Sequence, residues 1–125
     1  MENKKTVGTG MPEIVVIGAA IMDVLARPAD KAMFRTGSSP MEDICMSTGG
    51  DALNEAVILA RMGKKVRLET VLGDDHAGRM IREMCIEEGI VVDPLQIRPE
   101  MPTGINVVLI KEDGERSFLT NANGS

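Results

Sequence analysis

The chain has 125 residues, of which 43% are hydrophobic and 26% charged, and its formal net charge is −5. This composition is typical of a globular domain, and no apolar run approaches the roughly 20 residues that a membrane span needs. The acidic balance and the lack of a Lys/Arg-rich run argue against a nucleic-acid partner, because phosphate binding relies on clustered cations.

The cysteines and the histidine indicate a reducing compartment and no metal site. Cys45 and Cys85 do not form a CxxC pair, so we expect reduced thiols in a cytoplasmic protein. His76 is the only histidine in the sequence, and no second His or Cys stands at the spacing of a metal ligand.

The first half of the chain predicts a strand, an irregular segment and a helix. The run EIVVIGAA (residues 13–20) is short and apolar, as in a parallel-sheet strand that is buried on both faces. Residues 27–46 are rich in turn formers, with short strand-like pieces. The helix that follows has apolar residues at helical spacing and ends at Gly63. Its inward-facing residues are expected to be Leu53, Ala56, Val57 and Ala60.

The second half continues the alternation of strands and helices. Residues 65–73 predict a strand, residues 74–89 a helix capped by Asp74 or Asp75, and residues 90–97 a strand-like segment. Residues 103–122 predict two strands around an Asp-Gly turn. This order is typical of a layered α/β fold. The second helix is expected to bury Ala77, Met80, Ile81 and Met84, and the ten methionines are expected to fill the core.

The stretch STGGDALN, which precedes the first helix, permits two interpretations. Helix N-termini expose unpaired N–H groups, and glycines there allow a ligand to approach the backbone. Asn54, one turn into the helix, could then donate to and accept from that ligand. Alternatively, Gly49 and Gly50 only form a tight turn with Asp51 as the N-cap. A phosphate-binding loop is disfavoured, because the spacing of neither glycine-rich phosphate motif is present.

Asp23 is the second candidate for ligand binding. It follows the first predicted strand in VIGAAIMD, at the carboxyl end where α/β proteins usually bind ligands. A carboxylate there can accept two hydrogen bonds from neighbouring sugar hydroxyls. The alternative is a solvated loop acid or a helix cap.

Taken in order, VIGAAIMD, STGGDALNEAVILARMG, VLGDDHAGRMI, TGINVVLI and DGERSFLTNANG resemble the N-terminal part of the ribokinase-like (PfkB-type) carbohydrate kinases. The resemblance covers the chain from Ile14 onward. It implies part of a three-layer α/β sandwich with a small β lid, built from about residues 31–47 and 103–120. In that family the lid covers the sugar and often forms the dimer interface, so the resemblance also implies a homodimer.

The resemblance implies roles for single residues. The GDD at Asp74 and Asp75 is expected to be structural, and no role follows for His76. Sugar hydroxyls are expected to bind Asp23, Gly49, Gly50, Asn54 and Asn106, with Asn121 and Asn123 as secondary candidates.

The second signature of the family, of the D-T-x-G-A-G-D type, is absent from these 125 residues. That motif supplies the catalytic base, the anion hole and part of the nucleotide site. We therefore expect the base and the nucleotide-binding portion to lie beyond Ser125, and residues 1–125 to be the sugar-binding portion. ATP and Mg²⁺ are expected cofactors of the complete enzyme, and neither is expected to bind fully to this chain.

Two other functions remain open at this stage. One alternative is an inactive fragment or remnant that binds a sugar or self-associates through its lid strands. A dinucleotide-binding domain is disfavoured, because its glycine fingerprint would follow the first strand, where this chain has GAAIMD. Within the kinase interpretation, Asn106 favours a simple sugar such as ribose, fructose or a keto-deoxy sugar acid over a nucleoside.

Overall fold

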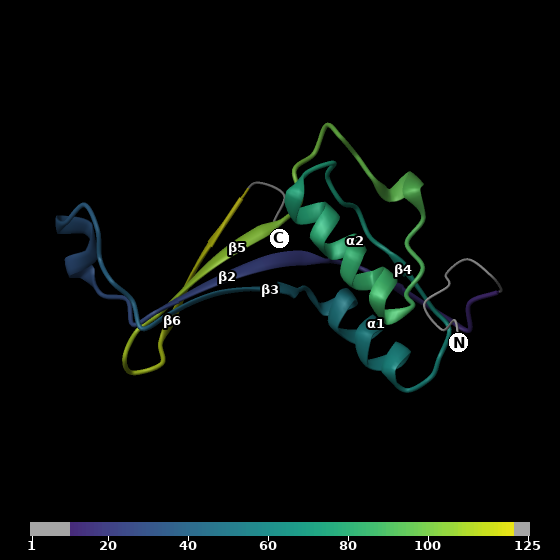
Figure 1. The fold of residues 1–125 in the computed structure, drawn as a ribbon, viewed down its shortest axis with the longest axis horizontal. Helices are drawn as coiled ribbons and strands as arrows, with labels where there is room; N and C mark the ends of the chain where they lie inside the picture. The colour runs from purple at the N-terminus through teal and green to yellow at the C-terminus, as the bar shows by residue number, and fades with distance from the viewer. Residues whose placement is uncertain (1–10, 122–125) are drawn as a thin grey trace.

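The computed structural model describes residues 11–121. The two α-helices and one short sheet gather at one end, and a four-stranded sheet extends away from them (Figure 1). The elements in chain order are β1 (Ile14–Ile17), β2 (Ile21–Arg27), η1 (Lys31–Arg35), β3 (Asp43–Gly49), α1 (Asp51–Arg61), β4 (Val66–Glu69), α2 (His76–Glu88), η2 (Pro94–Gln96), β5 (Ile105–Ile110) and β6 (Arg116–Thr120).

The main core lies between the β1–β4 pair and the two α-helices. β1 and β4 are parallel, and alternation along β4 buries Val66 and Leu68 against the helices. The other face of this pair carries Ile17, whose side chain is 78% exposed. The parallel pairing is as predicted, but the expectation that the first strand is buried on both faces is wrong for the described residues.

The four-stranded sheet has the order β3-β2-β5-β6. β2 runs parallel to β5, while β3 and β6 are antiparallel to their neighbours. The predicted hairpin is confirmed as β5 and β6, joined through Gly114, whose φ of 89° suits a glycine. The sheet therefore combines two segments from the first half of the chain with two from the second.

Strand β2 was not predicted from the sequence. The sequence predicts a single strand over residues 13–20, but the chain bends after Ile17 and enters a different sheet at Ile21. Gly18 has a φ of 151°, and the short side chains of Ala19 and Ala20 give no polar signal of the break. Asp23 consequently lies inside a strand, and not in a loop after the first strand as expected.

The helices form close to where they were predicted. Asp75 is the N-cap of α2, and Gly89 ends that helix with a φ of 77°. Leu53 and Ala56 of α1 are fully buried. Residues 90–97, predicted to be strand-like, form only isolated bridges and the short helix η2.

The methionines mostly do not fill the core. Met22 is buried, but Met80, which was expected to face inward, is exposed. Since α2 buries Ile81 and Cys85 instead, its apolar face is rotated away from Met80. Other exposed methionines in the described chain are Met11, Met46, Met62 and Met101.

Candidate functional site

Asp23 lies at the centre of a polar row that crosses the four-stranded sheet. It is in register with Ser47 on β3 and with Asn106 on β5, and Asn106 is in register with Thr120 on β6. Residues in register point to the same face of a sheet. The sheet therefore presents Asp23 and Asn106 side by side, from strands that are far apart in the sequence.

Gly49 accommodates the Asp23 carboxylate. A β-carbon at Gly49 would overlap the Asp23 Oδ2 atom, so only glycine leaves room for this carboxylate. The next residue, Gly50, has a φ of 97°, and a β-carbon there would lie 2.5 Å from the carbonyl oxygen of Ala19. The backbone around Gly50 thus requires a glycine, and Gly49 leaves room for the Asp23 side chain in this position. The sequence interpretation did not include these packing roles.

The N-terminus of α1 is not capped by a side chain. Its N-cap is Gly50, and not Asp51 as in the alternative drawn from the sequence. Among the described residues, the N–H groups of Asp51 and Ala52 have no hydrogen-bond partner, whereas the N–H of Leu53 donates to Ala19 O at 3.3 Å. The helix start therefore offers free donors and the partial positive charge of its dipole.

Asn54 lies in the first turn of the same helix and is exposed. Within residues 11–121, the side chains of Asp23, Asn54 and Asn106 form no hydrogen bond. One carboxylate supplies only acceptors, and two amides supply both donors and acceptors. This set matches the mixed requirements of neighbouring hydroxyl groups, which both donate and accept.

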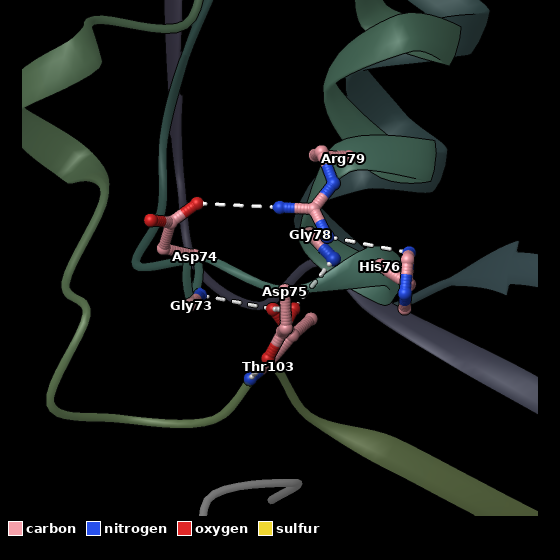
Figure 2. Close-up of polar contacts among 7 residues, drawn as sticks. All are labelled: Gly73, Asp74, Asp75, His76, Gly78, Arg79 and Thr103. Carbon is pink, nitrogen blue, oxygen red and sulfur yellow. Dashed lines mark hydrogen bonds and ion pairs between the residues drawn. The ribbon is translucent and has the colours of Figure 1, made fainter.

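Asp75 and Thr103 form a second polar cluster, at the start of α2 (Figure 2). Asp75 Oδ1 accepts hydrogen bonds from Gly78 N at 2.8 Å and from Thr103 Oγ1 at 2.6 Å, and Oδ2 accepts from Thr103 N at 2.9 Å. Partial burial by itself raises the pKa of Asp75. The hydrogen bonds from Thr103 and Gly78, together with the charge of Arg79, outweigh it and hold the pKa below its ordinary value.

The neighbouring residues of this cluster are exposed. Asp74 pairs with Arg79 at 3.3 Å, and Arg79 also lies 3.2 Å from His76 Nδ1 (Figure 2). The expectation that the GDD motif caps the second helix is confirmed for Asp75. Thr103 was not singled out from the sequence. Its only signal is a hydroxyl residue before Gly104 at the start of an apolar strand.

Asn121 and Asn123 are the two secondary candidates from the sequence. Asn121 holds the chain through both atoms of its amide, since Nδ2 donates to Thr103 O at 2.9 Å and Oδ1 accepts from Ile105 N at 3.2 Å. Its amide therefore has a structural role at the start of β5 in this arrangement. Asn123 lies outside the described residues.

The remaining reactive groups do not form a site. Over residues 11–121, no three His, Cys, Asp or Glu side chains are placed to hold a metal ion, and no helix is long and apolar enough to cross a membrane. Cys45 is exposed and Cys85 buried. Burial, followed by the nearby Glu88 charge, raises the pKa of the Cys85 thiol to about 11, so that it stays protonated and unreactive.

Comparison with known proteins adds the evolutionary context of this site. Residues 11–125 match the model of the pfkB family carbohydrate kinases. A sugar kinase of Escherichia coli is 32% identical over 112 residues, which are 90% of this chain and 34% of that protein. An aminoimidazole riboside kinase of Salmonella typhimurium is 36% identical over 70 residues, which are 56% of this chain and 22% of that protein.

Solved structures agree with this match. A fructokinase of Xylella fastidiosa shares 32% identity and a TM-score of 0.69 across 87% of this chain and 32% of its own. The same enzyme with bound ATP gives 28% identity and a TM-score of 0.70, over 89% of this chain and 33% of its own. The predicted fold class, part of a ribokinase-like α/β structure, is confirmed. The chain spans about a third or less of the length of these proteins.

Proposed function

Because the chain belongs to the pfkB family of carbohydrate kinases, we propose that it is the sugar-binding portion of an enzyme that transfers a phosphoryl group from ATP to a sugar hydroxyl. The observation that carries this proposal is the open polar row of Asp23 and Asn106 beside the uncapped start of α1. Such a row pairs acceptors and donors with hydroxyls without attracting a phosphate, because the Asp23 carboxylate repels anions.

Each residue in the row has a distinct role in this proposal. Asp23 accepts hydrogen bonds from two neighbouring hydroxyls, and Asn106 and Asn54 complete the set with amides. Gly50 brings the free N–H groups of α1 close to the sugar, and Gly49 makes room for the carboxylate. A hydrogen bond to a charged group contributes more than a neutral one, so Asp23 dominates the affinity.

ATP and Mg²⁺ belong to the complete enzyme in this proposal. The described acidic side chains are not gathered as a metal site, and the sequence has neither glycine-rich phosphate motif. These residues therefore do not fit a magnesium–nucleotide complex. We assign to this chain only the binding and orientation of the sugar, and to further polypeptide the catalytic base and the nucleotide.

The substrate we propose is a simple sugar such as ribose, fructose or a keto-deoxy sugar acid. Asn106 supports this choice, because its amide can hydrogen-bond a sugar hydroxyl, whereas a nucleoside site is expected to present an apolar surface to the base. The fructokinase of Xylella fastidiosa is a sugar kinase by its name. The alternative substrate is a nucleoside-like compound, because one relative is an aminoimidazole riboside kinase of Salmonella typhimurium.

We also propose that the four-stranded sheet serves as a lid and joins two copies of the protein. The sheet face opposite Asp23 carries the register row Met46, Val24, Val107 and Leu119. Met46 is 58% exposed, and Ile44, on the same face, is 64% exposed. An apolar face of this kind is a typical protein–protein contact. It also supports the second candidate function, a fragment that only self-associates or binds a sugar.

The test begins with the natural gene product, isolated from its source cells. Its intact mass is measured, and the protein is then incubated with ATP, Mg²⁺ and a panel of simple sugars and nucleosides. We expect a mass well above 13.4 kDa and ATP-dependent phosphorylation of a sugar. A 13.4 kDa product that binds a sugar or self-associates without phosphorylating it would instead establish the second candidate.

A further inference from the structure

The start of strand β5, residues 103–105, forms hydrogen bonds with three other parts of the fold. Gly104 O accepts a hydrogen bond from Met22 N of β2 at 3.0 Å, and Thr103 O and Ile105 N both bond the Asn121 amide after β6. The third contact comes from outside the sheet, where Asp75 at the start of α2 accepts from Thr103 N and Oγ1. The Asp75–Thr103 contact thus adds a polar connection between the start of α2 and the four-stranded sheet, beside the apolar packing of Ile81 and Cys85 in the core that includes Met22 of β2.

Thr103 is tightly packed in this connection. The residue is only 1% exposed, and its hydroxyl also accepts a hydrogen bond from Gly73 N at 2.9 Å. A β-carbon at Gly78 would lie 2.8 Å from Thr103 Oγ1, and one at Gly73 would lie 2.8 Å from Thr103 N. Glycines at both positions therefore allow α2 and the start of β5 to approach this closely.

This connection bears directly on the proposed sugar site. Asn106 lies three residues after Thr103 in the sequence, and it is paired in register with Asp23. A change in the direction of β5 at Thr103 therefore moves Asn106 relative to Asp23. We propose that Asp75 is a positioning residue: its carboxylate fixes the start of β5 and thereby holds Asn106 beside Asp23. This inference rests on the proposed sugar-binding function.

A helix cap alone would not need this arrangement. Capping requires one acceptor for Gly78 N, whereas Asp75 uses its second oxygen for Thr103 N. An asparagine at this position keeps one acceptor for the helix but directs an amide donor toward Thr103. Conversely, a valine at position 103 keeps the volume of threonine and the cap of α2, but removes the hydroxyl that joins them.

The experiment compares Asp75→Asn and Thr103→Val with the wild type in the complete natural protein. Asp74→Asn is the matched control, because Asp74 is the exposed neighbouring acid that contacts Arg79 and not Thr103. Sugar and ATP affinities are measured by calorimetry, using the sugar that the panel identifies. Amide hydrogen exchange is measured over residues 76–80 and 103–106.

We expect both test variants to weaken sugar binding by about tenfold, the loss typical of one charge-assisted hydrogen bond, with ATP affinity unchanged. Thr103→Val should also speed exchange over residues 103–106 while leaving the first turn of α2 protected. Thr103→Ser should restore both properties, because it restores the hydroxyl. Asp74→Asn should match the wild type.

The proposal is overturned if Thr103→Val and Asp75→Asn lower only the unfolding temperature and leave sugar affinity unchanged. Should the wild-type protein bind no sugar at all, the proposed function fails. Hydrogen exchange then tests separately whether the Asp75–Thr103 contact fixes the start of β5. Faster exchange over residues 103–106 in Thr103→Val supports the fixing of β5 by the Asp75–Thr103 contact, and unchanged exchange there rejects it.

Discussion

Gly49 illustrates how a residue without a side chain determines the position of a functional one. Because a β-carbon there would overlap the Asp23 carboxylate, Gly49→Ala must displace either the carboxylate or strand β3. We expect the free energy of unfolding to fall by about 1–3 kcal/mol, as for other overpacked sites, and sugar affinity to fall with it. Urea denaturation and calorimetry of the complete protein measure the two effects.

Gly37→Ala is the matched control for this substitution. A β-carbon at Gly37 meets nothing within 4 Å, so the same chemical change should leave stability and affinity near those of the wild type. If Gly49→Ala behaves like Gly37→Ala, the packing of Asp23 against Gly49 contributes to neither stability nor sugar affinity.

Asp75 makes stability depend on pH in a defined direction. Its pKa in the folded protein lies below the ordinary value of 3.8, so the folded state favours the charged carboxylate. The stabilisation is complete above that ordinary value and is lost as the pH falls through the lower, folded pKa. We therefore expect the unfolding temperature to drop between about pH 5 and pH 2, and to drop less steeply in Asp75→Asn. Thermal unfolding followed by circular dichroism measures both slopes, and equal slopes would contradict this role of Asp75.

At the scale of elements, the four-stranded sheet was harder to predict from sequence than the helices. The helices carry local signals, namely apolar spacing in α1, the Asp75 cap and Gly89 at the end of α2. Strand β2 has no such signal, because the bend between β1 and β2 consists of small residues. Its partners β3 and β5 are also distant in sequence, so its pairing cannot be derived from a local pattern.

The exposed apolar face of this sheet leads to a prediction about assembly. Met46→Asp places a charge in the row formed with Val24, Val107 and Leu119. If this face joins two copies, the charge should weaken the dimer by at least tenfold, since burying an unpaired charge is costly. Analytical ultracentrifugation over a range of concentrations measures the dissociation constant.

Ile58→Asp serves as the control for this prediction. Ile58 is a comparably exposed apolar residue, 59% accessible, but it lies on α1 and not on the sheet. Its substitution should leave the dimer intact. A wild-type protein that remains monomeric, or equal effects of both substitutions, would reject the sheet as the dimer interface.

At the scale of the whole molecule, the sequence named candidate residues for a site but not the contacts between them. Asp23 and the glycine pair were singled out as candidates, but their proximity was not, because it joins β2 to the end of β3. The contact between Asp75 and Thr103 spans 28 residues, and it follows only from the tertiary fold, which brings the start of α2 next to the segment before β5. Family membership, in contrast, follows from short motifs that keep their order along the chain.

In the proposed function, Asp23 binds the sugar and takes no part in binding ATP. The most direct measurement is calorimetry of the complete natural protein with its sugar and, separately, with ATP, for the wild type and for Asp23→Asn. Asp43→Asn is the control, because Asp43 is an exposed acid in the same sheet that pairs with Arg27 at 3.5 Å. We predict that Asp23→Asn weakens sugar binding by about 10- to 100-fold and leaves ATP affinity unchanged. Unchanged sugar affinity, or an equal loss of both affinities, would contradict the account.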